Sequence, residues 1–265
     1  MLSSIRTAAA VALACAAIGA QAHNLFLKPS STLLIKGDAV TVDASASDDL
    51  LFFDHPLALD GLVITAPDGS TVAPQNVMKG LVRSVFDLKP EQEGTYRMAV
   101  AGSSFFGAYK DAAGQMKRLR GTAEELARQI PADAQDLRVT ETSSRAETFV
   151  TLGKPTALRL SGKGLELSPL SSPTDLSAGD EARFVFHLDG KPAANLDVVL
   201  VPDGKRYRDA VGETRFKTDA NGQLTIKFPA AGMYWLGASA KDGNTSAPIA
   251  KERRLTYTAT LEVLP

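Results

Sequence analysis

The sequence predicts an all-β protein with two β-sandwich units in tandem and one short helix between them. Several short runs alternate apolar with polar or small residues, as half-buried strands do; they lie at 95–100, 183–188, 197–201 and 224–228. Turn-forming Pro-Asp-Gly and Ala-Asn-Gly triplets occur at 67–69, 202–204 and 220–222, and such residues favour tight connections. The same order of signals also occurs twice along the chain.

The repeat is what predicts two units rather than one. The first copy has Gly-Asp at 37–38, VITAPDG at 63–69 and GTYRMAV at 94–100; the second has Gly-Asp at 179–180, VVLVPDG at 198–204 and GMYWLGA at 232–238. Self-similarity of this kind indicates tandem sandwiches, although generic turn signals can also agree by chance. The first copy is longer, because it contains an inserted stretch, DDLLFFDHPLALDG, at 48–61. Long loops on a rigid sandwich are where function tends to lie.

The connecting segment holds the predicted helix, TAEELARQI at 122–130. Thr122 suits the N-cap, acidic residues occupy the first turn, and Pro131 follows the end. We therefore expect a signal peptide at 1–22, an N-terminal sandwich at 23–106, a connecting segment at 107–160 and a C-terminal sandwich at 161–265.

The first 22 residues have the layout of a secretory signal. Arg6 is their only charge, a short apolar stretch follows, and Ala20-Gln21-Ala22 forms an A-x-A cleavage site. The apolar stretch is short for a membrane span, which needs about 20 apolar residues. Cleavage after Ala22 would leave His23 as the N-terminus of a periplasmic protein. The alternative is a lipid anchor at Cys15, for which the surrounding motif is poor.

Composition excludes several function classes. Lys and Arg number 29 and Asp and Glu number 30, so no basic excess indicates a nucleic-acid partner. Cys15 is the only cysteine and leaves with the signal, which excludes thiolate metal sites and cysteine nucleophiles from the mature chain. No His-Glu-x-x-His, Gly-x-Ser-x-Gly or phosphate-binding glycine motif is present. We therefore expect a binding protein and not an enzyme.

His23 is the first candidate metal ligand. A histidine at a free N-terminus offers two nitrogens in chelating geometry, its α-amine and its ring Nδ1, and the amine has a pKa near 8. Such nitrogen donors suit copper, nickel, cobalt and zinc. The alternative is that His23 follows the cleavage site by accident.

The inserted stretch supplies the other candidates, Asp54 and His55 in FFDHP. His55 would add a third nitrogen to the His23 chelate, and Asp54 could orient the ring or complete the site. The alternative is an ordinary surface-loop histidine. The third histidine, His187, follows Phe184 and Phe186 in a predicted strand, and alternation points it away from that core side. We expect a structural or solvent-facing role for it.

Several segments resemble a family of exported bacterial proteins of unknown function that is grouped with the periplasmic components of nickel and cobalt transport systems. They are HNLFLKPS, FDHPLALDG, GLELSPLSSP, and the run from DGKPAANLDVVLVPDGKRYRD to TDANGQLTIKFPAAGMYWL. The resemblance implies tandem immunoglobulin-like sandwiches and a histidine at or beside the mature N-terminus, which His23 matches. Relatives thought to handle nickel carry further histidines there, whereas Asn24 and Leu25 follow His23 in this chain.

Three functions are compatible with these features. The first is a periplasmic protein that binds a divalent transition metal and passes it to a membrane transporter or outer-membrane receptor. The second is a non-catalytic accessory or adhesion module of the cell envelope. The third is a copper-dependent oxidative enzyme of the histidine-brace type, for which the sequence offers no evident flat aromatic substrate face.

Overall fold

The computed structural model describes residues 24–265, and nearly all of its regular structure is β-strand in three sheets. Sheet A belongs to the N-terminal half and orders its strands β1-β3-β8-β7, with β4 beside β3. Its strands are β1 (Asn24–Pro29), β3 (Val40–Ser47), β4 (His55–Pro56), β7 (Gln75–Lys79) and β8 (Ser84–Leu88). Sheet C belongs to the C-terminal half and contains β12 (Leu165–Pro169), β13 (Glu181–Leu188), β14 (Lys191–Pro192) and β17 (Gln223–Lys227).

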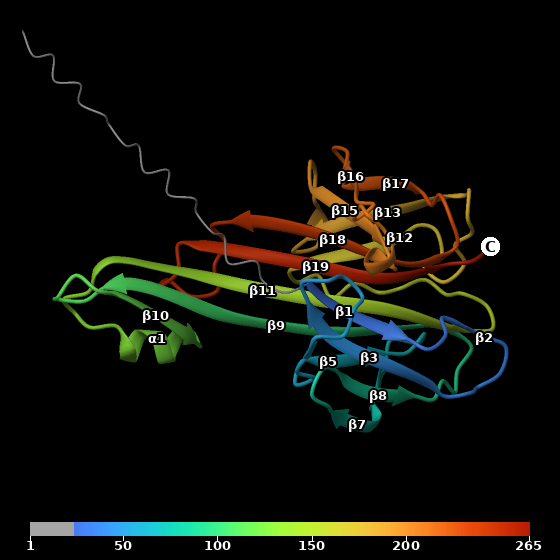
Figure 1. Cartoon of the computed structure of the whole chain (residues 1–265), viewed down its shortest axis with the longest axis horizontal. Helices are drawn as coiled ribbons and strands as arrows, with labels where there is room; N and C mark the ends of the chain where they lie inside the picture. Colours follow the sequence, from blue (N-terminus) through green and yellow to red (C-terminus); the bar gives the residue numbers. More distant parts are fainter. Residues whose placement is uncertain (1–23) are drawn as a thin grey trace, which may run out of the picture.

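Sheet B is the largest and takes strands from both halves of the chain. Its order is β16-β15-β18-β19-β11-β9-β5-β6, with β10 beside β9 and β2 beside β11. The strands are β2 (Leu33–Leu34), β5 (Leu62–Thr65), β6 (Thr71–Val72), β9 (Gly94–Lys110), β10 (Met116–Gly121), β11 (Gln135–Leu152), β15 (Asp197–Pro202), β16 (Thr214–Lys217), β18 (Gly232–Asp242) and β19 (Glu252–Val263). The two halves join where β11 pairs in parallel with β19. In Figure 1 the long strands β9 and β11 run through the whole molecule.

Sheets A and C pack against opposite faces of sheet B. Successive residues of a strand point to opposite faces, and on β11 Phe149 belongs to the core under sheet C whereas Val150 belongs to the core under sheet A. On β18, Leu236 joins the sheet C core and Trp235 contacts the sheet A side. The molecule is therefore two sandwiches that share one central sheet.

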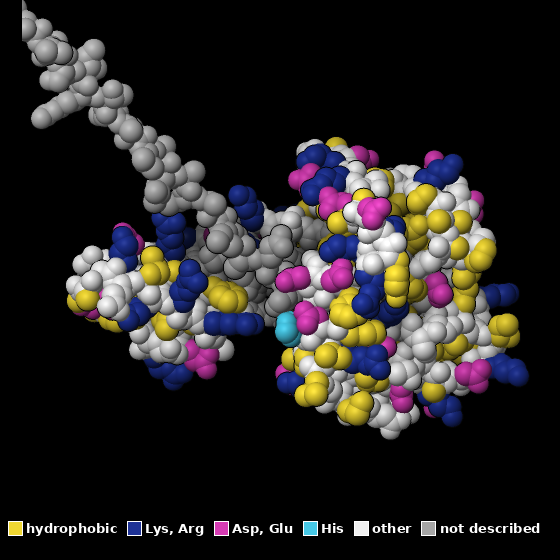
Figure 2. Space-filling view, viewed as in Figure 1, with side chains coloured by type: hydrophobic (Ala, Val, Ile, Leu, Met, Phe, Trp, Pro, Cys, Tyr) yellow, Lys and Arg dark blue, Asp and Glu magenta, His cyan; other side chains and the backbone are white. Residues whose placement is uncertain are grey.

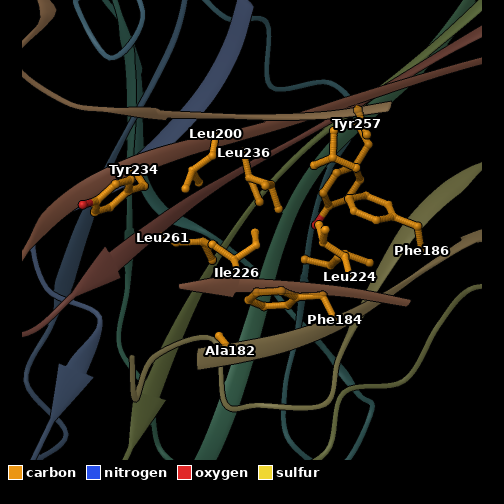
Figure 3. Close-up of a cluster of buried hydrophobic side chains, with 14 of the residues drawn as sticks. Ala182, Phe184, Phe186, Leu200, Leu224, Ile226, Tyr234, Leu236, Tyr257 and Leu261 are labelled. Atoms are coloured by element: carbon orange, nitrogen blue, oxygen red, sulfur yellow. The ribbon is translucent and has the colours of Figure 1, made fainter. Parts of the chain in front are cut away.

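The core between sheets B and C is the larger of the two. It is closed by edge-to-face contacts of aromatic rings, Phe186 with Tyr257 and Phe228 with Tyr234, whose centroids are 5.6 and 5.1 Å apart. Figure 3 shows Phe186 of β13, Tyr234 of β18 and Tyr257 of β19 in this core, together with Leu224 and Ile226 of β17. The core between sheets A and B contains fewer large side chains, with Phe86, Tyr96 and Met98 at its centre.

A buried ionic cluster lies in the shared sheet beneath β12. The Glu147 carboxylate accepts hydrogen bonds from Arg145 Nε at 2.5 Å and from the Tyr257 hydroxyl at 2.6 Å. Arg97 lies 3.6 Å from the same carboxylate and donates to the carbonyl of Leu167 on β12 at 2.9 Å. Burial, followed by the Glu147 charge, raises the pKa of Tyr257 well above its usual value. The cluster links β9, β11 and β19 of both halves to sheet C.

These observations confirm the all-β class and the short helix. The helix α1 spans Ala123–Gln129, and Thr122 caps it through a reciprocal capping box with Glu125. A short 3₁₀ helix, η1 (Lys205–Tyr207), follows β15. The expected boundary at residue 106 falls inside β9, and the boundary at 160 falls between β11 and β12. Within residues 24–265, no helix is long and apolar enough to cross a membrane.

Candidate functional site

His55 forms β4 at the edge of sheet A, together with Pro56. Two hydrogen bonds through the buried Ser45 hydroxyl fix the segment: it donates to the His55 carbonyl at 2.9 Å and accepts from the Asp54 amide at 3.3 Å. The His55 side chain is 54% exposed, and its Nε2 lies 3.5 Å from Asp54 Oδ2. The structure therefore brings Asp54 and His55 together on a segment whose backbone is anchored.

The pairing register places His55 beside the start of the N-terminal strand. Leu25 on β1 pairs with Ala46 on β3, and Ala46 pairs on its other side with His55 on β4. Neighbouring strands are about 4.8 Å apart, so the backbones of Leu25 and His55 are about 10 Å apart. Asn24, the first described residue, pairs one position along, with Ser47.

A third apolar cluster holds both β1 and the inserted loop against sheet B. Phe26 of β1 and Phe53 of the loop have ring centroids 5.8 Å apart, and both pack on Val201 and Trp235. The indole Nε1 of Trp235 also donates to the carbonyl of Leu25 at 3.1 Å. The C-terminal half thus provides the support on which the start of the chain and the His55 loop rest.

A groove of about 530 Å³ lies where the chain enters the structure. Asn24 and Leu25 form one wall, and the floor is the face of sheet B around Trp235, Gly237 and Thr258. His23, which the sequence identified as the first metal ligand, lies outside the described residues, as does the proposed signal peptide.

Within residues 24–265, no group of three or more His, Cys, Asp and Glu side chains is arranged to hold a metal ion. The structure adds one acidic candidate that sequence reasoning missed: Asp48 is exposed and directly follows Ser47, the partner of Asn24. The Asp48-Asp49 pair at the start of the insertion was the available signal.

His187 lies far from this region in the topology. It sits on β13 of sheet C, opposite Glu166, and sheet C covers the other face of sheet B. Phe184 and Phe186 point into the core as their alternation predicted, while His187 is half-buried and its Nδ1 is buried with no hydrogen-bond partner in the described chain. His187 therefore lies on the face of sheet C away from the Phe184 and Phe186 core, as its alternation predicted.

A second hollow, of about 300 Å³, separates the inserted loop from the turn that follows β15. The Arg206 guanidinium stacks over Phe52 at 4.6 Å from the ring centroid. Two ion pairs cross between the halves: Lys205 with Asp49 at 3.1 Å and Lys28 with Asp203 at 2.8 Å. Both phenylalanines of the loop thus contact a guanidinium, since Arg83 lies over Phe53 at 4.8 Å, but only Phe53 also packs in the apolar cluster.

Several solved structures match most of this chain at low sequence identity. The D0–D1 domain of intimin matches with 14% identity and a TM-score of 0.24, covering 90% of this chain and 97% of that chain. The Yersinia pseudotuberculosis adhesin InvE matches with 12% identity and a TM-score of 0.21, covering 89% of this chain and 58% of that one. Chicken CNTN1 domains FN1–FN3 match with 9% identity and a TM-score of 0.26, covering 91% and 98%. TM-scores this low support no inference about function.

No curated protein matches the sequence. One family model does, and it spans residues 20–242, which is most of the chain and includes the β1 strand, the inserted loop and sheet C. The chain therefore belongs to the DUF4198 family, whose defining domain is one of unknown function.

Proposed function

We propose that this protein binds a divalent transition metal ion in the periplasm and delivers it for uptake. The ligands are the α-amine and ring of His23 at the mature N-terminus and the ring of His55. Asp54 orients the His55 ring, in the way that carboxylates beside metal-binding histidines do. Asp48 is a further oxygen donor beside the entry of the chain.

The register of β1, β3 and β4 is the observation that supports this proposal most directly. It sets His55 in the same row as Leu25, two strands and about 10 Å away. Paired residues of an antiparallel sheet project to the same face, so the His55 ring lies on the face that Leu25 occupies. The proposal requires the amine and ring of His23 and the ring of His55 to bridge this distance of about 10 Å and meet at one metal ion.

The rigid support of both segments is the second argument. Metal sites need ligands whose positions are fixed by their surroundings. The Trp235 hydrogen bond to Leu25 fixes β1, and Ser45 fixes the Asp54–His55 backbone. The ligand chemistry, imidazole and amine nitrogen, fits nickel, cobalt, copper or zinc.

Isothermal titration calorimetry of protein that begins at His23, with each of the four metals, tests the proposal. His23→Ala and His55→Ala are expected to weaken binding by more than about 100-fold, because loss of an outer partner alone costs about 10–100-fold. Asp54→Asn, which removes such a partner, is expected to weaken binding by about 10-fold. A variant with one glycine added before His23 keeps both rings but moves the amine, and should bind as weakly as His23→Ala.

His187→Ala is the matched control, because it removes an imidazole from sheet C and should leave the affinity unchanged. Equal affinity in the native, His23→Ala and His55→Ala proteins would overturn the proposal and favour a non-catalytic envelope module. Release of oxidised sugars by the copper-loaded protein, dependent on oxygen, would instead favour an enzyme. Delivery is tested by the nickel and cobalt content of cells with and without the gene.

A further inference from the structure

The far ends of β9 and β11 extend beyond both sandwiches and form an arm together with β10 and α1, residues 103–140 (Figure 1). One face of the arm is covered. Phe105 and Val139 point to that face and pack with Leu126 of α1 and Ala250 of the loop before β19. The opposite face carries the intervening residues and is not covered by any described segment, which leaves Phe106 41% exposed.

Three arginines gather on this open face, in two rows of paired residues. Arg118 on β10 pairs with Ala108 on β9, which pairs with Arg138 on β11. Arg120 pairs with Phe106, and its guanidinium stacks over that ring at 5.1 Å from the centroid. Figure 2 shows Lys and Arg side chains spread over the projecting arm, with fewer Asp and Glu among them.

The carboxylates of the arm pair with lysines first: the hydrogen bond and charge of Lys110 lower the pKa of Asp136, and the charge of Arg138 contributes less. Lys117 pairs with Asp111 at 3.3 Å, Lys110 pairs with Asp136 at 2.7 Å, and Glu125 is used in the helix cap. None of the three arginines forms an ion pair with a carboxylate in the part of the chain that the structure describes. Their positive charge therefore faces solvent on a flat sheet surface.

The arginines also lie along an open sheet edge. Among residues 24–265, β10 pairs only with β9, and no backbone hydrogen bond joins its outer edge to another strand. Met116, at the start of β10, is 55% exposed. Proteins often place charged residues on edge strands to prevent association, which explains a cation on β10 itself. Arg138 lies two strands away on β11, before Thr140, where the pairing of β11 with β19 begins, so β9 is its one strand partner among the described residues.

We propose that this face of the arm binds an acidic, extended segment of a partner protein that lies along β10. Charge complementarity between opposed patches gives such interfaces their specificity and speeds association. Alternate residues of an extended chain are about 6.8 Å apart on one side, which is the repeat of Arg118 and Arg120 along β10. Carboxylates at alternate positions of the partner would accept hydrogen bonds from these two arginines in turn, while Arg138 donates to a third carboxylate across the face.

A protein segment fits this surface better than a membrane does. The cations follow the strand register, and Phe106 lies in one row with Arg120, whereas Met116 lies at the start of β10, ahead of both arginines. Phe106 and the Arg120 stack would contact an apolar residue of the partner, since aromatic and Arg residues are the common anchors of interfaces.

Binding to a synthetic ten-residue peptide of alternating Glu and Thr tests the proposal, with the Gln and Thr peptide as its uncharged match. We expect the full mature protein to bind the Glu peptide, measured by biolayer interferometry, and to bind it more weakly as salt rises. The triple variant Arg118→Gln, Arg120→Gln and Arg138→Gln should weaken binding by about tenfold or more, because it removes all three cations of the open face. A tenfold loss corresponds to about 1.4 kcal/mol of binding free energy.

The matched control replaces three exposed lysines elsewhere, Lys163→Gln, Lys191→Gln and Lys227→Gln, which changes the net charge equally and should leave binding intact. Circular dichroism establishes that both triple variants are folded. Equal loss in both variants would mean that net charge alone attracts the peptide and would overturn the proposal. So would binding to anionic phosphatidylglycerol vesicles with none to the Glu peptide. Phe106→Ala leaves every charge in place and removes only the apolar contact. It should therefore weaken the binding of a Glu and Thr peptide with one central Phe more than the binding of the peptide without Phe.

Discussion

The two faces of the shared sheet B are built for different tasks. The face under sheet C buries a core of 22 residues, whereas the face under sheet A buries 13. The sheet A side also carries the start of the chain, the His55 loop, the groove of about 530 Å³ and the open face of the arm. The larger core therefore provides most of the stability, and the smaller, less covered side presents the surfaces that can meet ligands.

The comparison is sharpest in the two large core replacements. Phe186→Ala on the sheet C side and Phe86→Ala on the sheet A side should each lower the free energy of unfolding by about 3–5 kcal/mol. Because both cores rest on β9 and β11, we expect one cooperative transition in chemical denaturation followed by circular dichroism. If instead each protein unfolded in two transitions, and each variant lowered the midpoint of a different one, the two sandwiches would fold independently.

The buried ionic cluster is the next largest effect, because it joins the two sides. Glu147→Gln removes the charge that Arg145 and Arg97 face, and breaking a buried pair in this way costs about 3 kcal/mol or more. Denaturation of Glu147→Gln measures it, with the exposed Glu181→Gln on β13 as a control that should change stability by less than about 0.5 kcal/mol. A cost for Glu147→Gln no larger than the control would mean that the cluster does not link the halves.

Two neighbouring aromatic residues, Trp235 and Tyr234, distinguish an effect on the β1 strand from an effect on overall stability. Trp235→Phe removes the hydrogen bond to Leu25, and Tyr234→Phe removes the hydroxyl bond to the Ala230 carbonyl at 2.8 Å on the other face. Each should cost about 1 kcal/mol. Only Trp235→Phe should speed amide hydrogen exchange in β1, at Phe26 and Leu27. Equal exchange in the two variants would mean that Trp235 does not hold the N-terminal strand.

The smallest expected effect is on acid stability. Hydrogen bonds from Arg253 lower the pKa values of Asp189 and Asp242, which tie sheet C to the ends of β18 and β19. A lowered folded-state pKa contributes stability that is complete above the unfolded value of about 3.9 and is lost as pH falls through the folded values. On the sheet A side, burial raises the pKa of Asp43 against the opposing charge of Arg83, so that residue contributes with the opposite sign.

Arg253→Met tests this difference. Its stability deficit relative to the native protein should be present at pH 6 and should shrink as pH falls below about 4, measured by thermal unfolding across the range. Arg83→Met should show a smaller narrowing, because Arg83 pairs with one carboxylate, Asp43, at 3.0 Å, whereas Arg253 pairs with two. A constant deficit for Arg253→Met at all pH values would mean that its carboxylate partners contribute nothing to acid sensitivity.

Much of the local structure follows from sequence pattern. Alternation predicted the strands at 95–100, 183–188, 197–201 and 224–228, and the Thr122 cap predicted α1; the structure confirms them. The shared sheet was not predictable, because the far half of β9 begins with Gly102, Ser103 and Ser104, which indicate a turn. The parallel pairing of β11 with β19 joins segments more than a hundred residues apart, and a period of two carries no information about such partners.

The candidate site shows the same division. The insertion was visible as a length difference between the repeats, and Asp54 and His55 were visible within it. The support under them was not, because the repeat segment GMYWLGA that contains Trp235 does not indicate a contact outside its own sandwich. The bond of Trp235 to Leu25 depends on the fold of both halves. His23 stays a prediction of the sequence.

Trp235 is the only tryptophan of the chain and lines the groove at Asn24 while its ring bonds to the β1 backbone. The protein thus has a single intrinsic tryptophan fluorophore beside the start of β1. Its emission reports this one location, and a nearby paramagnetic ion such as Cu²⁺ or Ni²⁺ would quench it. The cleavage and metal binding proposed above could both be followed in this way without any attached dye.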